Sequence, residues 1–562
     1  MIEIRRGILA RWARIGALAM VCVMPAKAQE MRRPAIERVA IDWGATGADF
    51  EDYRGVIDTA RARGRLRLAT QAQIALLKLR FATLRNADLQ ATVNGLIGER
   101  FTSVTTSPTP VLLPFDVPRY LADRLSGNGA GPTASYLNGF SATKYFQPGP
   151  SGYDAMFGIS AAEASKIPGV TTTQNVTVTM AGSSLFYVLT DPTPPPDEVD
   201  PRFPELSSKV LRVIHERALR FTFHRYGAPY LVSIDCQPPG QNLKLLPCEM
   251  ADKIAVRFLK SLRLAGGAPP KTKTAFAAPD TIDRPKCPDP DFAYHSPGEL
   301  TPGGGVNGLG GKVDYSVYAR LRFPIVTSRA YANSQVFLNG GGCLSDLPRT
   351  NNMEPPPNAK GDSYACKQNP AKKLTFFEGA KENYDYPWRD NFCESRDWPL
   401  GQCPGNMGHQ GQDVRGDKCV TKDASSVMCE PYHHRINAVR NGVLQHDPAY
   451  PGLYLIVNNA SEHLRFRYLH MNPAFLERDG MVTGREVREG DRLGMMGTYL
   501  GSVGGTNYHL HFDVQVPTRD GWLFVSPYMT LVAAYERALG RFGTEIKADG
   551  TRAAPTAGVG CR

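Results

Sequence analysis

The chain of 562 residues is too long for one hydrophobic core, and its length favours roughly two to four domains. Hydrophobic residues make up 42% of the chain and charged residues 21%, which excludes a disordered, collagen-like or coiled-coil protein. The net charge is +11, but no basic run interleaved with aromatic residues occurs, so we expect no nucleic-acid partner.

The N-terminal residues have the pattern of an export signal. Several arginines precede an apolar run from Ile15 to Met24, and the small-residue pattern Ala26-Lys27-Ala28 follows that run. An uncleaved anchor is the alternative, but the run is only about half the roughly twenty residues that a membrane span needs. We therefore expect a signal peptide over residues 1–28 and no transmembrane segment in the mature chain. The expected location is outside the cytoplasm of a bacterium, either periplasmic or secreted.

Export to an oxidising compartment makes the cysteines candidates for disulfide bonds. Of the 11 cysteines, Cys22 lies in the signal peptide, which leaves an even number in the mature chain. A structural zinc cluster is the alternative, although the sequence contains no CxxC pair. We expect local pairing of Cys236 with Cys248, Cys393 with Cys403, and Cys419 with Cys429.

Residues 29–265 combine helical and strand-like patterns and are expected to form an α+β region of unknown role. Helical spacing extends from Ala48 to about Arg100, and a second helix is expected over Met250–Leu264. Thr171–Thr179 alternates as a strand does, and Arg220–Cys236 is typical of two strands. The apolar stripe of the first helical stretch consists of Ile74, Leu77, Phe81 and Leu84.

A Pro/Gly-rich stretch at residues 266–311 is expected to be a linker. Residues 312–536 are rich in strand patterns and long enough for one mainly antiparallel all-β domain with loop insertions. Residues 537–562 are expected to form a flexible tail. The expected strands of the β domain are Tyr315–Ile325, Gly452–Val457, Leu464–Tyr468 and His509–Val516.

Two histidines on one expected strand are candidate metal ligands. If His509–Val516 is a strand, His509 and His511 lie on the same face, where they can share a metal or divide into a ligand and a catalyst. One strand cannot enclose a metal, so further ligands must come from other segments. His470 is one candidate, and alternation along the preceding strand places it on the face of Leu464.

A second segment offers the other ligands. His409 and Asp413 are four residues apart and point to the same side of an extended chain, with Gly411 between them allowing close backbone approach. Two histidines and one carboxylate make a catalytic type of zinc site, which leaves a position for water.

The motif order HxGxD, YxH and HxH in a β-rich region resembles the LytM/lysostaphin-type zinc metallopeptidases, which cut peptide bonds in the bacterial cell wall. The resemblance covers about residues 380–532. Three further segments are similar to family patterns: Ala438–Val443 resembles AVxxGxV, Val487–Gly494 resembles VxxGxxIG, and Ser526–Tyr528 resembles the closing NP segment.

The resemblance implies a duplicated hybrid motif fold and one Zn²⁺ per chain. It assigns His409, Asp413 and His511 as the zinc ligands and His470 and His509 as the catalytic pair. The pair would orient and deprotonate the hydrolytic water and stabilise the oxyanion. The implied partner is the peptide stem of peptidoglycan, and the implied enzyme is a zinc metalloendopeptidase.

A non-enzymatic function is the alternative. Some LytM-type domains have lost ligands and instead activate, or act as a scaffold for, a cell-wall amidase. Here all five residues are present, which favours an enzyme. The other histidines are expected in different roles: His433 and His434 in a loop or lining the groove, and His446 and His463 at the surface.

Overall fold

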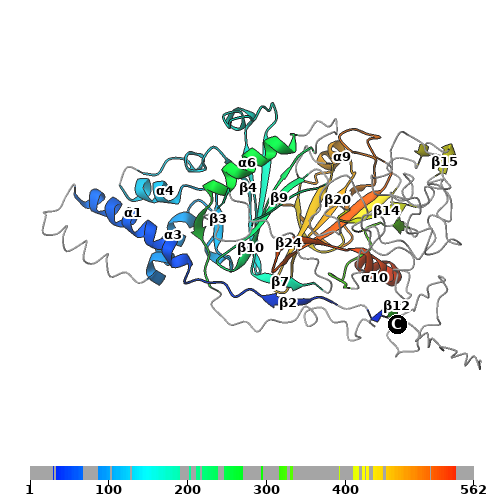
Figure 1. Cartoon of the computed structure of the whole chain (residues 1–562), viewed down its shortest axis with the longest axis horizontal. Coiled ribbons are helices and arrows are strands. Elements are labelled where there is room, and N and C mark those ends of the chain that lie inside the picture. The colour runs from blue at the N-terminus through cyan, green and yellow to red at the C-terminus, as the bar shows by residue number, and fades with distance from the viewer. Residues whose placement is uncertain are drawn as a thin grey trace, which may run out of the picture.

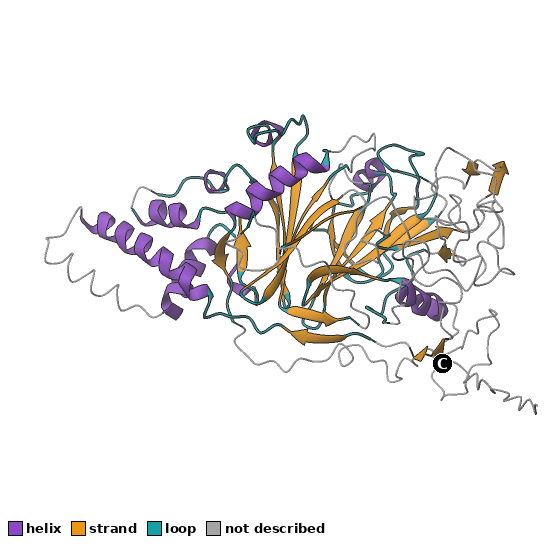
Figure 2. Ribbon diagram, in the orientation of Figure 1, coloured by secondary structure: helices purple, strands orange, loops and turns teal. Residues whose placement is uncertain are grey.

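Two antiparallel β-sheets lie next to each other at the centre of the computed structural model, and several helices gather beyond the first sheet (Figures 1 and 2). The structure describes the chain except for residues 1–28, 31–32, 67–85, 102–103, 127–128, 190–201, 204–209, 216–217, 238–245, 270–292, 295–315, 326–329, 333–391, 393–408, 417–419, 424–425, 429–433, 447–450, 507 and 539–562.

The first sheet has the strand order β4-β5-β6-β10-β9-β8, and every neighbouring pair is antiparallel. The hairpin between β9 and β10 turns at Tyr226 and Gly227, which both have positive φ (53° and 80°), as a tight hairpin turn requires. The strands are β4 Ser141–Gly149, β5 Gly152–Ile159, β6 Val176–Ser183, β8 Leu211–His215, β9 Ala218–Arg225 and β10 Ala228–Asp235.

Alternation along β9 gives the first sheet two different faces. Leu219, Phe221 and Phe223 belong to the first hydrophobic core, which the helices cover. Arg220 and Thr222 point the other way and bond to the second sheet.

Helices cover the apolar face of the first sheet. Helix α6, Cys248–Ser261, contacts β9 and β10 and buries Ile254 and Phe258. The disulfide Cys236–Cys248 joins the end of β10 to the start of α6, which confirms the predicted pairing. The other helical elements of this half are α1 Thr46–Leu66, α3 Asn86–Gly98, η1 Val104–Thr106, α4 Val117–Leu125, η2 Thr133–Tyr136 and α5 Ala161–Ala164.

The second sheet has the strand order β13-β14-β23-β20-β19-β18-β21, and β24 pairs with the C-terminal half of β23. Leu510, Phe512 and Val514 of β23 lie in a second hydrophobic core together with Leu531 of α10, Tyr528–Ala538. The strands are β13 Ala330–Ala332, β14 Gln412–Gly416, β18 Gly442–Gln445, β19 Leu453–Asn458, β20 His463–Leu469, β21 Glu486–Val487, β23 Leu510–Thr518 and β24 Gly521–Val525.

Short antiparallel pairs and one short helix complete the described structure. The helix is α9, Pro473–Arg478. The pairs are β1 Gln29–Glu30 with β12 Ala293–Tyr294, β2 Ala35–Arg38 with β7 Leu185–Val188, β3 Val111–Leu113 with β11 Arg263–Gly266, β15 Val420–Asp423 with β16 Ser426–Met428, and β17 Arg435–Asn437 with β22 Arg492–Met495.

The two sheets pack against each other through both apolar and polar residues, and Trp522 of β24 packs on Ala181 and Leu231 of the first sheet. Strands β9 and β10 contact β24, and β10 also contacts β23. The backbone N–H of Trp522 donates to Thr222 Oγ1 (2.6 Å), and His463 Nε2 lies 3.1 Å from Asp154 Oδ2. A side chain added at Gly521, where φ is +102°, would collide with Thr222. The two sheets are therefore in close van der Waals contact at Gly521 and Thr222, with no space for an added side chain.

The predicted mainly antiparallel character of the β region is confirmed, but one predicted strand is wrong. Residues 316–325 are an extended segment buried against the second core and joined to β17 by a bridge between Ile325 and Ile436. Pro324 lacks the N–H that a continuous ladder would need. The strand predicted from Thr171 begins only at Val176.

Several predictions concern residues outside those that the structure describes. They are the signal peptide, the helical stripe of Ile74, Leu77, Phe81 and Leu84, most of the linker, the tail beyond residue 538, and the pairs Cys393–Cys403 and Cys419–Cys429. Of the helices in the described part of the chain, none is long and apolar enough to cross a membrane.

Candidate metal centre

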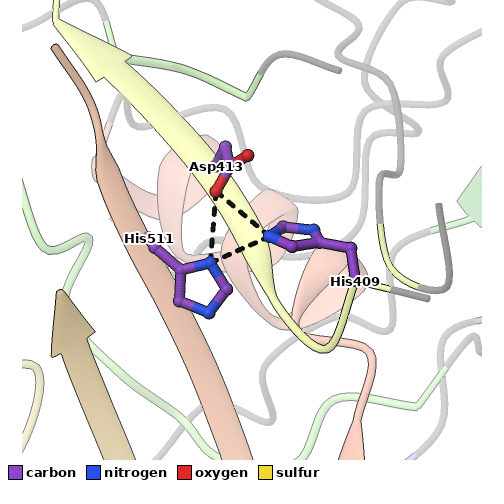
Figure 3. Close-up of side chains that lie close together, drawn as sticks. All are labelled: His409, Asp413 and His511. Carbon is purple, nitrogen blue, oxygen red and sulfur yellow. Dashed lines mark hydrogen bonds and ion pairs between the residues drawn. The ribbon is translucent and has the colours of Figure 1, made fainter. Parts of the chain in front are cut away.

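Strand pairing brings Asp413 and His511 together. Strands β14 and β23 are antiparallel neighbours, and their register places Asp413 directly opposite His511. His409 precedes β14, and its ring reaches the same point, so that the three side chains converge (Figure 3). The structure thus brings together the three residues that the sequence motifs predict as ligands.

The spacing of the three donor atoms fits a zinc ion. His409 Nε2 lies 2.8 Å from His511 Nδ1, and Asp413 Oδ1 lies 3.2 Å from each of these nitrogens. Ligands at about 2.0–2.1 Å from zinc in tetrahedral geometry are about 3.3 Å apart. Two imidazoles and one carboxylate at this spacing fit Zn²⁺ and leave a fourth position for water or substrate.

Gly411 makes the convergence sterically possible. A Cβ atom at this position would lie 2.7 Å from His511 Nε2 and 2.7 Å from the carbonyl oxygen of Phe512. The glycine expected to allow close backbone approach therefore does so, because any side chain would displace β23 or the His511 ring.

The carboxyl of Asp413 is held in its ionised form. Burial by itself would raise its pKa, but the neighbouring His409 and His509 outweigh burial and bring the pKa well below its usual range. The side chains of His409, Asp413 and His511 are at most 1% exposed, so little water screens these interactions. An ionised carboxylate is the form that binds a metal cation.

His509 and His470 stand beside the three donors. His509 Nε2 lies 3.4 Å from Asp413 Oδ1, and the His509 and His470 ring centroids are 4.4 Å apart. Strand alternation alone would place His470 on the face of Leu464, as the sequence predicts. Strand β20 instead ends at Leu469, so His470 does not continue the alternation of the strand. Its backbone has a positive φ of 68°, and its ring lies next to His509.

A hydrogen bond determines the tautomer of His470. Its Nδ1 lies 3.1 Å from the carbonyl oxygen of Tyr499, which can only accept a hydrogen bond. Nδ1 therefore carries the proton, and in the neutral ring Nε2 carries the lone pair. This is the form that a general base requires.

Asp513, which no sequence motif predicts, lies behind His511. Asp513 Oδ2 lies 3.3 Å from His511 Nε2, the ring nitrogen that faces away from the donor group. Metal-binding histidines commonly donate their second N–H to such an acceptor. Burial raises the pKa of Asp513, but Arg467, which donates to this carboxylate, and His511 together outweigh burial and bring the pKa below its usual value. Strand alternation could have indicated this contact, because it places residues 511 and 513 on the same face of one strand.

The remaining histidines in the described part of this region are not among the three donors. His434 is buried with its Nδ1 3.0 Å from the Tyr508 hydroxyl, one residue before His509. The predictions of His446 and His463 as surface residues are wrong. His446 is 5% exposed and bonds to the Gly452 carbonyl, and His463 is fully buried because the first sheet covers its strand.

Comparisons with known proteins find similarity in solved structures only. No protein-family model matches the chain, and no curated protein matches it. A protein of Ruminococcus gnavus assigned as a glycyl-glycine endopeptidase LytM is 22% identical with a TM-score of 0.18, over 22% of this chain and 47% of that chain. The catalytic domain of the antimicrobial peptidase lysostaphin from Staphylococcus simulans is 22% identical with a TM-score of 0.17, over 24% of this chain and 85% of that chain.

Proposed function

We propose that the protein is an exported zinc-dependent endopeptidase that hydrolyses peptide bonds in peptidoglycan cross-links. The observation that supports this most is the convergence of His409, Asp413 and His511, with donor atoms 2.8–3.2 Å apart, beside His470 and His509. We further propose that residues 312–536 form the catalytic domain, that residues 29–265 form a second domain, and that residues 1–28 are a cleaved signal peptide.

The chemistry follows from the types of residue and their protonation. A zinc ion held by His409, Asp413 and His511 would supply Lewis acidity at this site and lower the pKa of a water molecule bound there toward about 7. His470, protonated on Nδ1 through its bond to Tyr499, offers Nε2 as the base that accepts a proton from water, and as an imidazolium it returns that proton to the departing amine. His509, next to it, donates a hydrogen bond to the oxyanion.

The test is digestion of isolated peptidoglycan by the purified mature chain, with the released muropeptides separated and identified by mass spectrometry. We expect fragments that end at a peptide cross-link. His509→Ala is the control for a contaminating hydrolase, since it should release none. Release of glycan fragments only, or of nothing, would contradict the endopeptidase.

The alternative function, activation of a cell-wall amidase, predicts a different result in the same assay. A chain that releases no muropeptide by itself but increases release by an added amidase would be an activator. In that case His509→Ala would activate as well as the wild type does, because activation needs no turnover at the metal centre.

A further inference from the structure

One face of β23 carries a chain of hydrogen bonds that runs from the metal centre into the first sheet. His511, Asp513 and Gln515 alternate along this face, while Leu510, Phe512 and Val514 occupy the opposite, apolar face. His511 Nε2 lies 3.3 Å from Asp513 Oδ2, and Gln515 Nε2 donates to Asp513 Oδ1 at 3.1 Å. Three successive residues of one face are thus connected.

The series of hydrogen bonds ends at Arg220, on strand β9 of the first sheet. A guanidinium nitrogen of Arg220 donates to Gln515 Oε1, across 295 residues of sequence. The same guanidinium lies over the ring of Phe524 on β24, 4.6 Å from its centroid. Arg220 therefore contacts the second sheet through both its charge and its flat face.

The chemistry of the partners determines the direction of every bond. Arginine only donates, so the amide of Gln515 must turn its oxygen to Arg220 and its nitrogen to Asp513. An ionised carboxylate only accepts, so Nε2 of His511, which faces Asp513, carries a proton. A metal ion between the three donors would take up the lone pair on Nδ1, the atom that faces His409 and Asp413.

Burial makes these bonds strong. His511, Asp513 and Gln515 are fully buried and Arg220 is 5% exposed, so water does not compete for the donors and acceptors. Burial lowers the pKa of Arg220 to about 9, which still leaves the guanidinium charged at neutral pH.

We propose that Gln515 and Arg220 are positioning residues for His511. The first sheet then contributes to metal binding through Arg220, which lies on its strand β9. The inference rests on the proposed function only in requiring a metal at His409, Asp413 and His511. Outer partners of metal-binding histidines typically change metal affinity by about 10–100-fold. The bond from Arg220 fixes the amide that in turn fixes Asp513 and the ring of His511.

The experiment measures Zn²⁺ affinity of the full-length mature chain by competition with a chelator, and the visible spectrum of the Co²⁺-loaded protein. We expect Gln515→Leu and Arg220→Met to weaken Zn²⁺ binding about 10-fold and to alter the Co²⁺ spectrum. Gln515→Met is the second variant. Its side chain has a similar length but bonds neither to Arg220 nor to Asp513, so metal affinity should fall as it does in Gln515→Leu.

Thr222→Val is the matched control. Thr222 also lies on β9 and also bonds across the interface, to the backbone N–H of Trp522, but it has no connection to Asp513. This variant should lose thermal stability and keep the Zn²⁺ affinity and the Co²⁺ spectrum of the wild type. An equal loss of affinity in Thr222→Val and Arg220→Met would overturn the inference, because general loosening of the interface would then explain both.

The outcomes separate this inference from the proposed function. A wild type that binds Zn²⁺ tightly but releases no muropeptide, with weaker binding in Gln515→Leu, leaves the inference standing and sinks the endopeptidase. A wild type that cuts peptidoglycan, with folded Gln515→Leu and Gln515→Met variants that bind Zn²⁺ as tightly, overturns the inference alone.

Discussion

The backbone at His470 has a conformation that histidine seldom adopts. Its φ is +68°, a region that costs a non-glycine residue of order 1–3 kcal/mol. Tyr499 holds the residue from both sides: its backbone N–H donates to the His470 carbonyl and its carbonyl accepts from His470 Nδ1. A Cβ at Gly497 would come within 2.6 Å of that His470 carbonyl. The loop after β22 is thus shaped to hold one histidine ring.

His470→Ala and His509→Ala should keep zinc and lose turnover. Each substitution removes a general-base or oxyanion contribution of about a hundredfold or more and leaves the three donors intact. Zinc content by mass spectrometry and the rate of muropeptide release would be measured on the same samples. Parallel loss of metal and activity in either variant would show that ligand and catalyst have been exchanged.

His511→Ala should lose most of its zinc. We expect about one zinc per wild-type chain, because loss of one of three protein ligands leaves a poor site. Metal analysis of the purified variant beside the wild type measures this directly. Equal zinc content in the two proteins would refute the assignment of His511 as a ligand.

The residues of the candidate site were predictable because their types and order form a pattern. Short motifs predicted which residues converge, but they say nothing about what lies behind a ligand. Asp513 belongs to no motif, and Arg220 comes from another sheet, 295 residues from its partner Gln515. His463 was predicted at the surface, but the first sheet covers it. Alternation tells which residues share a face of a strand, but not what covers that face.

Among the elements, strands with clear alternation were predicted well. Strands β19, β20 and β23 lie where the sequence places them, and the two strands expected within Arg220–Cys236 are β9 and β10. The extended segment 316–325 has the apolar alternation of a strand but contains Pro324, which a ladder does not accommodate. Helix α10 was not predicted, and only its first residue, Tyr528, lay in a recognised segment, the one that resembles the closing NP segment of the family.

Removal of the disulfide Cys236–Cys248 should destabilise the junction of β10 and α6. Both cysteines are buried, and the bond closes a short loop, for which stabilisation of about 2–4 kcal/mol is typical. The free energy of unfolding of the double alanine variant, measured in denaturant, should fall by that amount. Addition of reductant should lower the wild type to the same value and leave the variant unchanged.

Cys393, Cys403, Cys419 and Cys429 bracket His409 and Asp413 in the sequence. Their local pairing stays a prediction, and reduction is expected to lower zinc retention before the β region unfolds. Mass spectrometry of a non-reduced digest would identify the linked peptides. Free thiols at these four positions would end the hypothesis.

At the scale of the whole molecule, the sequence predicted two regions joined by a linker and did not predict their contact. Much of the contact is polar: Ser151 bonds to Asn458 and Asn459, and Asp154 pairs with His463. Polar side chains on a strand are usually a sign of solvent, so a pattern of hydrophobicity does not reveal a second sheet packed on them. Only the three-dimensional structure shows the contact between the two sheets.

Asp154→Ala should destabilise both halves of the molecule together. It leaves His463 buried without its acceptor, which costs about 1–3 kcal/mol. Calorimetry should show a single unfolding transition that moves to lower temperature, whereas Asp154→Asn, which keeps an oxygen acceptor, should move it less. Two separate transitions, with only one of them shifted, would mean that the sheets unfold independently.

The separation of 295 residues between Arg220 and Gln515 also has a consequence in time. In an exported protein the N-terminal part is made first and crosses the membrane first, and parts that arrive early fold first. The first sheet can therefore form, with Arg220 and Thr222 on its open face, before β23 arrives. A growing chain carries the HxGxD motif without the strand that completes it. The three donor residues of the proposed metal centre thus come together only with the last strands, and a chain that stops short of them lacks His511.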